Sequence, residues 1–180
     1  MKKKSSVKIV LCGIFAAFTA ICAMISIPFG PVPMNLAHVA IFVSSWILGP
    51  VWAAISQTIY IVIGVIGVPV FSNFSAGVGH ILGPTGGYIL AYPLVAYIAG
   101  IIFDIKKIKG IKSVILGVIF GWIIEYLVGT MYYSMVTGVT IGAAVMVCVL
   151  PFLLGDICKS VAVLFICRKI KSQRLLTKDQ

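Results

Sequence analysis

Long apolar segments separated by short breaks run along almost the whole chain. No Asp, Glu, Lys or Arg occurs between Lys8 and Asp104, and an uncharged apolar stretch of that length cannot be the surface of a water-soluble domain. Proline and glycine positions divide it, because proline cannot donate the next helical hydrogen bond. The pattern predicts six transmembrane helices, over residues 9–27, 36–48, 51–66, 88–103, 111–128 and 151–168. We therefore expect an all-α integral membrane protein in which residues 1–180 form a single domain.

The second, third and fourth predicted helices are short for a bilayer. At a rise of 1.5 Å per residue they measure roughly 20 to 24 Å, against a hydrocarbon core of about 30 Å. Helix ends inside lipid must be covered by protein or line a wet cavity. The long external connection 67–87, between the third and fourth helices, is therefore expected to fold back into the mouth of the bundle. Residues 131–150 are expected to form a loop with a short helix.

Basic residues set the predicted orientation. The chain carries 14 Lys and Arg against 4 Asp and Glu, a net charge of +10. With six spans all the basic clusters fall on one side, and the excess of positive charge on cytoplasmic loops then predicts a cell-membrane protein with both termini in the cytoplasm. The clusters flank apolar segments without a polar or aromatic reading surface, so they indicate anionic lipid rather than nucleic acid. The three clusters are Lys2, Lys3, Lys4 and Lys8; Lys106, Lys107, Lys109 and Lys112; and Arg168, Lys169, Lys171, Arg174 and Lys178.

Metal and cofactor sites are not predicted. The five cysteines show no paired metal-ligand spacing, and most lie in apolar segments, where a thiol behaves as a small hydrophobe. His38 and His80 have no Glu or Cys nearby in the sequence that would complete a metal site.

Asp156 and Lys159 are the first candidates for a binding site. They lie within the last apolar helix, and their spacing of three places them on one face. Ionisable groups at that depth cost several kcal/mol unless they are paired or wetted, so they usually mark function. The alternative is a structural ion pair, since pairing alone can satisfy the burial penalty.

The external connection supplies further candidates. Gly86 and Gly87 precede Tyr88 at a predicted helix start, where backbone N–H groups are free to approach a polar ligand, although a plain tight turn is the alternative. Asn73 lies among aromatic residues, a composition typical of small-molecule pockets. Glu125, near the external end of the fifth helix, either lines the cavity or reaches the interface, and the sequence leaves both open.

Small residues form a stripe along the first helix, at Gly13, Ala16, Ala20 and Ala23. Such a stripe lets another helix approach closely within lipid. It serves either a partner protein or packing inside the bundle, and the sequence does not distinguish the two.

Taken together, these features resemble the BioY family, the biotin-specific membrane subunits (S components) of energy-coupling factor (ECF) vitamin transporters. The resemblance covers nearly the whole chain. It is carried by Val32-Pro33, Gly49-Pro50, Gln57, Tyr60, the segment from Gly67 to Phe71, the run from Gly83 to Tyr88, Pro151-Phe152, Gly155-Asp156 and Lys159.

The resemblance implies a six-helix subunit that captures biotin from outside the cell. It implies substrate contacts at Asn73, Gly86, Gly87, Tyr88, Asp156 and Lys159. It also implies docking, through Ala16 and Ala20, onto a transmembrane coupling protein (T component) that carries two ATPase subunits. The chain has no nucleotide-binding loop of its own, so energy must come from these partners.

The chain departs from the family pattern after Val32-Pro33, where Asn35 and Ala37 replace the usual threonine and glutamine. This departure gives no reason to assign ligand contacts to the first external loop. Three other hypotheses remain at this point: an S component for thiamin or riboflavin, a membrane-embedded enzyme with Asp156 and Glu125 as acid and base, and a purely structural membrane subunit. The enzyme hypothesis is weak, because no nucleophile or metal cluster accompanies the two carboxylates.

Overall fold

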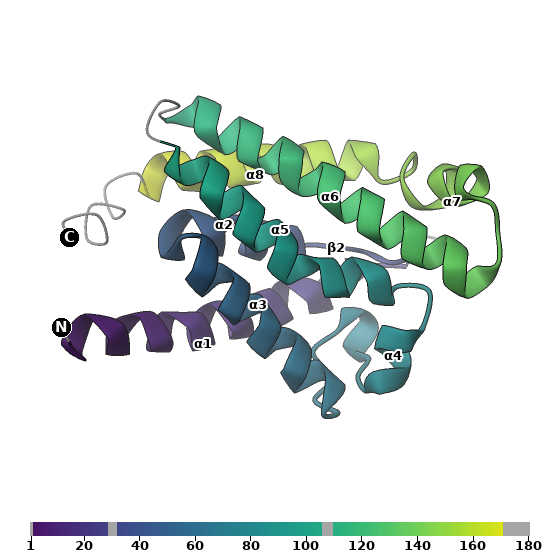
Figure 1. Cartoon of the computed structure of the whole chain (residues 1–180), viewed down its shortest axis with the longest axis horizontal. Coiled ribbons are helices and arrows are strands. Elements are labelled where there is room, and N and C mark those ends of the chain that lie inside the picture. The colour runs from purple at the N-terminus through teal and green to yellow at the C-terminus, as the bar shows by residue number, and fades with distance from the viewer. Residues whose placement is uncertain (1, 29–31, 106–109, 171–180) are drawn as a thin grey trace.

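The computed structural model describes residues 2–28, 32–105 and 110–170, with side chains from residue 6 onward. This part of the chain folds into helices that run back and forth along one long axis, with one two-stranded ribbon (Figure 1). In chain order the elements are α1 (Lys2–Met24), β1 (Ser26–Ile27), β2 (Met34–Asn35), α2 (Ala37–Leu48), α3 (Pro50–Val65), the 3₁₀ turn η1 (Ser72–Phe74), α4 (Val78–Leu82), α5 (Gly86–Asp104), α6 (Ile111–Thr137), α7 (Ile141–Cys148) and α8 (Leu153–Lys169).

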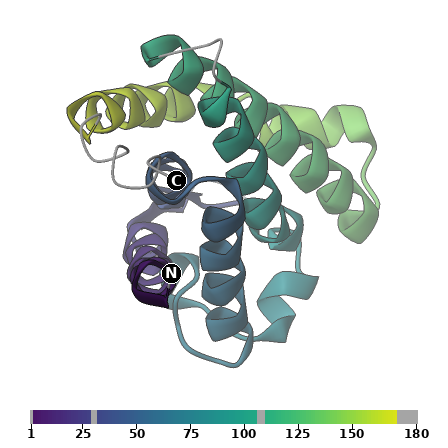
Figure 2. The ribbon, with the colours of Figure 1, turned by 60° about the vertical axis from the view of Figure 1, so that its left-hand side comes forward.

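Helices α2 and α5 form the centre of the bundle. Helix α5 packs against α2, α3 and α6, while α1 lies against α2 and α3, and α8 lies against α2 and α6 (Figure 2). Nearly every residue of α2 is buried, including its two polar serines Ser44 and Ser45, whose hydroxyls donate to the carbonyl oxygen of Ile41. A helix that is apolar all round is expected to be enclosed by its neighbours.

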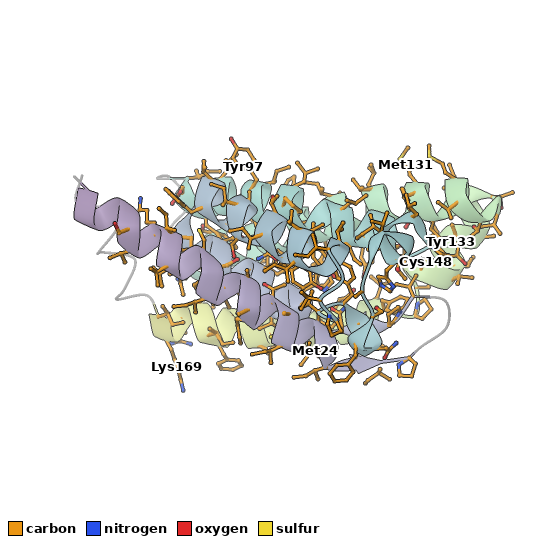
Figure 3. All side chains as sticks on the ribbon, turned by 90° about the horizontal axis from the view of Figure 1, so that it is seen from below. Met24, Tyr97, Met131, Tyr133, Cys148 and Lys169 are labelled. Carbon is orange, nitrogen blue, oxygen red and sulfur yellow. The ribbon has the colours of Figure 1, made fainter. Side chains whose placement is uncertain are left out.

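The outer faces of the bundle are apolar. Exposed leucine, isoleucine, valine and aromatic side chains cover the long helices, and Tyr97 and Met131 project outward from them (Figure 3). Among the described residues, three helical segments are long and apolar enough to cross a membrane: Ser6–Met24, Gly86–Asp104 and Ile111–Thr137. Helices α7 and α8, bent by 55° at their junction, pass the same test as a pair. The chain is a multi-pass membrane protein.

The predicted count of six spans stays a prediction. Helices α2 and α3 lie where the sequence placed the second and third spans, but they have only 12 and 16 residues. At the C-terminal end of α3, Gly64 lies against the ring of Phe71, and its carbonyl oxygen accepts a hydrogen bond from the Gly77 backbone N–H. The external connection thus covers this end of α3, as expected for a short helix in a membrane.

Three boundaries differ from the sequence-based prediction by three residues or more. Helix α1 begins at Lys2 rather than at residue 9. It ends at Met24 rather than at residue 27, because Ser26 and Ile27 pair with Asn35 and Met34 in the antiparallel ribbon. Helix α6 continues nine residues past the predicted end, to Thr137, and stops at Gly138, whose left-handed φ of 73° is accessible to glycine without strain. The prediction of a loop over residues 131–150 is therefore wrong for residues 131–137, which belong to α6, and the short helix predicted within it is α7.

The helix ends that adjoin the basic clusters lie at one end of the molecule. Helix α1 begins there, α5 ends and α6 begins there, and α8 ends there (Figure 1). Lys106, Lys107, Lys109, Lys171, Arg174 and Lys178 lie outside the described residues.

Glycine permits a close approach between α5 and the start of α3. A Cβ atom added at Gly100 would lie 2.6 Å from the Cα of Pro50, which is backbone and cannot move aside. We expect Gly100→Leu to lower the free energy of unfolding by about 1–3 kcal/mol through overpacking. Thermal unfolding of the detergent-solubilised protein measures it, with Ile101→Leu on the exposed face as the control; equal melting temperatures for the two variants would contradict the prediction.

Candidate functional site

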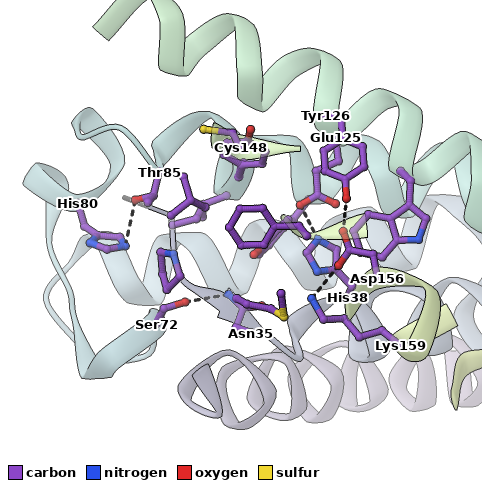
Figure 4. Close-up of a pocket in the computed structure, with 18 residues that line it drawn as sticks. Asn35, His38, Ser72, His80, Thr85, Glu125, Tyr126, Cys148, Asp156 and Lys159 are labelled. Carbon is purple, nitrogen blue, oxygen red and sulfur yellow. Dashed lines mark hydrogen bonds and ion pairs between the residues drawn. The ribbon is translucent and has the colours of Figure 1, made fainter. Parts of the chain in front are cut away.

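A hollow opens between α2, α5, α6 and α8, in the half of the bundle opposite the basic ends (Figure 4). Its empty volume, open solvent at the mouth included, is about 520 Å³. We call it the central pocket. It is lined by Val32, Pro33, Met34, Asn35, His38, Ser72, His80, Thr85, Tyr88, Ile89, Tyr92, Trp122, Glu125, Tyr126, Cys148, Phe152, Asp156 and Lys159.

Asp156 and Lys159 form a buried ion pair on the pocket wall. The Lys159 Nζ lies 2.8 Å from Asp156 Oδ1, and the two residues are 6% and 7% exposed. The Tyr126 hydroxyl donates to the other carboxylate oxygen, Oδ2, so both oxygens of Asp156 accept a hydrogen bond. Asp156 also lies in the first turn of α8, where the helix dipole favours negative charge. This carboxylate is therefore held by three separate effects.

A second acid–base pair, His38 and Glu125, lines the same pocket. His38 Nε2 hydrogen-bonds to Glu125 Oε1, and the Glu125 residue is only 2% exposed. Of the two roles left open for Glu125, the structure shows that it lines the cavity. His38 Nδ1 and Glu125 Oε2 have no partner among the described residues. An unsatisfied buried donor or acceptor costs free energy, so a ligand that reached these atoms would gain from pairing with them.

Aromatic rings make up the wall between the two pairs. The ring of Trp122 lies 4.4 Å from that of His38 and 5.8 Å from that of Tyr126, centroid to centroid, and Lys159 Nζ lies 5.8 Å from the Trp122 centroid. Trp122, Glu125 and Tyr126 have helical spacings of three and four, which place them on one face of α6. That spacing around the lone carboxylate of the helix is a signal that sequence analysis missed.

The far side of the pocket is polar but uncharged. Asn35 Nδ2 donates to Ser72 Oγ at 2.8 Å, and the ring of His80 stacks on that of Phe71 with centroids 5.3 Å apart. Burial lowers the pKa of His80 below its ordinary value, so its ring is neutral at neutral pH. Asn35 belongs to the first external loop, which the sequence departure had left without ligand contacts; the structure places this loop on the pocket wall.

The predicted substrate-binding residues divide into three groups. Tyr88, Asp156 and Lys159 line the central pocket. Asn73 lies in a neighbouring hollow that shares His80 and Thr85 with it, and its side chain accepts a hydrogen bond from Ser26 Oγ at 2.9 Å.

Gly86 and Gly87 are not among the residues that line either hollow. An added Cβ would fall 1.6 Å from the Ile81 carbonyl oxygen at Gly86 and 2.3 Å from the Tyr132 Cβ at Gly87. These glycines therefore let the start of α5 pack closely against α4 and α6. Their contact with a ligand stays a prediction.

The small-residue stripe of α1 faces inward at the two predicted docking positions. Ala16 and Ala20 are buried at 2% and 9% exposure within the core formed with α2 and α3, so there they serve packing. Gly13 and Ala17 lie exposed on the adjoining face of α1, with no atom within 4 Å of a Cβ added at Gly13. Docking through Ala16 and Ala20 stays a prediction that their burial does not favour.

Comparison with known proteins agrees with this geometry. The model of the BioY family matches residues 1–175. The chain belongs to the BioY family. It is 36% identical over 161 residues to a "Probable biotin transporter BioY" of Pyrococcus horikoshii, covering 89% of this chain and 94% of the relative. It is 35% identical over 159 residues to a "Biotin transporter BioY" of Thermotoga maritima, covering 88% and 83%.

A solved structure shares the fold. The crystal structure at 2.1 Å of the S-component for biotin from an ECF-type ABC transporter matches with a TM-score of 0.87 and 26% identity, covering 96% of this chain and 95% of that one. BioY-family proteins are transport components, and this chain is not an enzyme. Among the described residues, no group of three His, Cys, Asp or Glu side chains is placed to hold a metal ion.

The ion pair in α8 is expected to matter for stability. Lys159→Met removes the cationic partner of the buried Asp156 carboxyl, so we expect the free energy of unfolding to fall by about 3–5 kcal/mol. The double variant Asp156→Asn/Lys159→Met removes both charges, so its free energy of unfolding should fall less than that of Lys159→Met. Equilibrium unfolding in detergent tests this order, with Cys158→Ala, exposed on the same helix, as the control; a double variant less stable than Lys159→Met would contradict it.

Proposed function

We propose that this chain is the high-affinity biotin-binding S component of an ATP-driven vitamin uptake transporter. The observation that carries the proposal is the Asp156–Lys159 pair, buried yet lining a pocket in the half of the bundle away from the basic clusters. The named biotin transporters of the same family and the S component for biotin of similar structure support the same ligand. No observation favours thiamin or riboflavin over biotin.

The pocket chemistry fits the three parts of biotin. Biotin has a ureido ring with hydrogen-bond donors and an acceptor, a thioether bicycle that prefers apolar walls, and a carboxylate. Asp156 accepts from ureido N–H groups, and Lys159 donates to the ureido carbonyl or pairs with the carboxylate. The rings of Trp122, Tyr126 and Tyr88 supply apolar area around these polar groups. Asn73, in the neighbouring hollow, lies where a ligand would enter or where its outer end would rest.

The same proposal sets the topology. Six spans, with α2 and α3 counted despite their length, place all three basic clusters on one side, and the charge rule makes that side cytoplasmic. The half of the bundle that contains the central pocket then lies toward the outside, as uptake requires. The T component and its two ATPase subunits complete the transporter and supply the energy.

Removal of either charge is expected to weaken biotin binding. Asp156→Asn and Lys159→Met each take away one partner of a desolvated, charged contact, which costs 2 kcal/mol or more, so the Kd should rise at least about 30-fold. Calorimetry on purified protein measures it, and Cys158→Ala, whose side chain is exposed between the two residues, should bind like the wild type.

A panel with thiamin and riboflavin accompanies this titration. Near-native biotin affinity in both charge variants would remove the site assignment. Tighter binding of another vitamin by the wild type would replace the proposed substrate.

The exposed face of α1 is the better candidate for docking. Gly13→Leu and Ala17→Leu add bulk where the structure leaves open space, so we expect biotin binding to persist while co-purification with the T component and ATPases falls about tenfold or more. Ala16→Leu instead overpacks the core and should lower the free energy of unfolding by about 1–3 kcal/mol.

Ala162→Leu on α8, also exposed, is the size-matched control. If the Gly13 and Ala17 variants co-purify normally with the T component and ATPases, the proposed docking face is wrong. A folded Ala16→Leu protein that binds biotin but fails to assemble would return docking to Ala16 and Ala20.

A further inference from the structure

A second hollow lies on the outside of the bundle, between α6 and α8. On each of these antiparallel helices the lining residues recur every three to four positions, so they form two stripes that face each other. The empty volume between the stripes is about 1090 Å³, open space included. We call it the α6–α8 groove. Its lining residues are Ile115, Val118, Ile119, Trp122, Ile123 and Tyr126 of α6 and Leu153, Asp156, Ile157, Ser160, Val161 and Leu164 of α8.

The groove has a closed end and an open end. At the closed end two hydrogen bonds cross from α6 to α8, from Trp122 Nε1 to Ser160 Oγ at 3.1 Å and from the Tyr126 hydroxyl to Asp156. Toward the other end the lining is purely apolar, with Ile119 and Val161 47% and 45% exposed. Apolar walls that face the bilayer are filled by hydrocarbon rather than by water.

At the open end, each stripe is followed by a basic residue. Lys112 lies three residues before Ile115, and Arg168 lies four residues after Leu164, so each is one helical turn beyond the groove on the face that lines it. Both side chains are exposed. Two cations at the mouth of an apolar groove complement an anionic headgroup attached to an acyl chain.

The length of the groove fits a single lipid chain. From Ile115 to Tyr126 it runs roughly 17 Å at 1.5 Å per residue, close to half of a hydrocarbon core of about 30 Å. A chain that started from a headgroup at Lys112 and Arg168 would thus reach the closed end near the middle of the membrane.

We propose that the α6–α8 groove binds one acyl chain of an anionic phospholipid, with the phosphate at Lys112 and Arg168. Trp122, Tyr126 and Asp156 line both this groove and the central pocket, so the lipid chain completes the wall that separates the buried charges from the bilayer. The lipid site stands independently of the identity of the vitamin.

The test uses the full chain in bilayers containing equal amounts of phosphatidylglycerol and phosphatidylcholine. After mild extraction, native mass spectrometry should show one phosphatidylglycerol retained per chain. Ile119→Trp and Val161→Trp fill the groove from its two sides and should abolish retention of either lipid. Ile101→Trp, on an α5 position that is 41% exposed and outside the groove, should retain it.

Charge variants test the headgroup separately. Lys112→Ala and Arg168→Ala should each lower the preference for phosphatidylglycerol about fivefold, while Lys8→Ala, on α1, should leave it unchanged. The proposal is overturned if both tryptophan variants retain lipid, or if both charge variants keep the preference for phosphatidylglycerol. It is also overturned if the wild type carries no lipid, or carries a second copy of the chain instead. Biotin titration of the same samples is read separately, so failure of the vitamin assignment does not decide this result.

Discussion

The pairing of Asp156 with Lys159 inside a membrane-embedded bundle constrains much of the surrounding structure. A charge in that environment persists only if it is paired and hydrogen-bonded. The partners come from two helices, because Lys159 shares α8 with Asp156 whereas the Tyr126 hydroxyl comes from α6. The register of α8 against α6 is therefore tied to one carboxylate. The same register places Trp122 over the lysine and opens the central pocket beside the pair.

Scarcity of charge made this part of the site visible in the sequence. With four acidic residues in the chain, an Asp within an apolar helix and a Lys three residues later stand out at once. Helix boundaries were also predictable where residues that break helices occur together: Gly49-Pro50 separates α2 from α3 in the structure as predicted. The end of α6 was not predictable from the sequence. Gly129 and Thr130 do not break the helix but are buried helical residues that pack against Tyr88. The helix ends instead at Gly138, which has a left-handed backbone conformation.

The rest of the site depends on tertiary contacts that spacing does not encode. His38 and Glu125 are separated by 87 residues, and each taken alone in its own helix has several possible roles. Rotation about a helix axis is equally hidden when the helix is apolar on all sides. On α1 the pairs 13/17 and 16/20 have the same spacing, and they differ only in which side of the helix faces α2 and α3. The sequence therefore identified a small-residue stripe but not the face available to a partner.

The two hollows that share Trp122, Tyr126 and Asp156 explain why the contact between α6 and α8 is both strong and incomplete. Two hydrogen bonds join the helices at the depth of the buried charges, and toward the basic end the helices present facing apolar stripes. Side chains large enough to close those stripes would remove the groove without touching the pocket. A wall that is one side chain thick has a polar face toward the ligand and an apolar face toward hydrocarbon. Asp156 can thus be reached from the pocket while the aromatic rings and the neighbouring hydrocarbon keep water away from its other side.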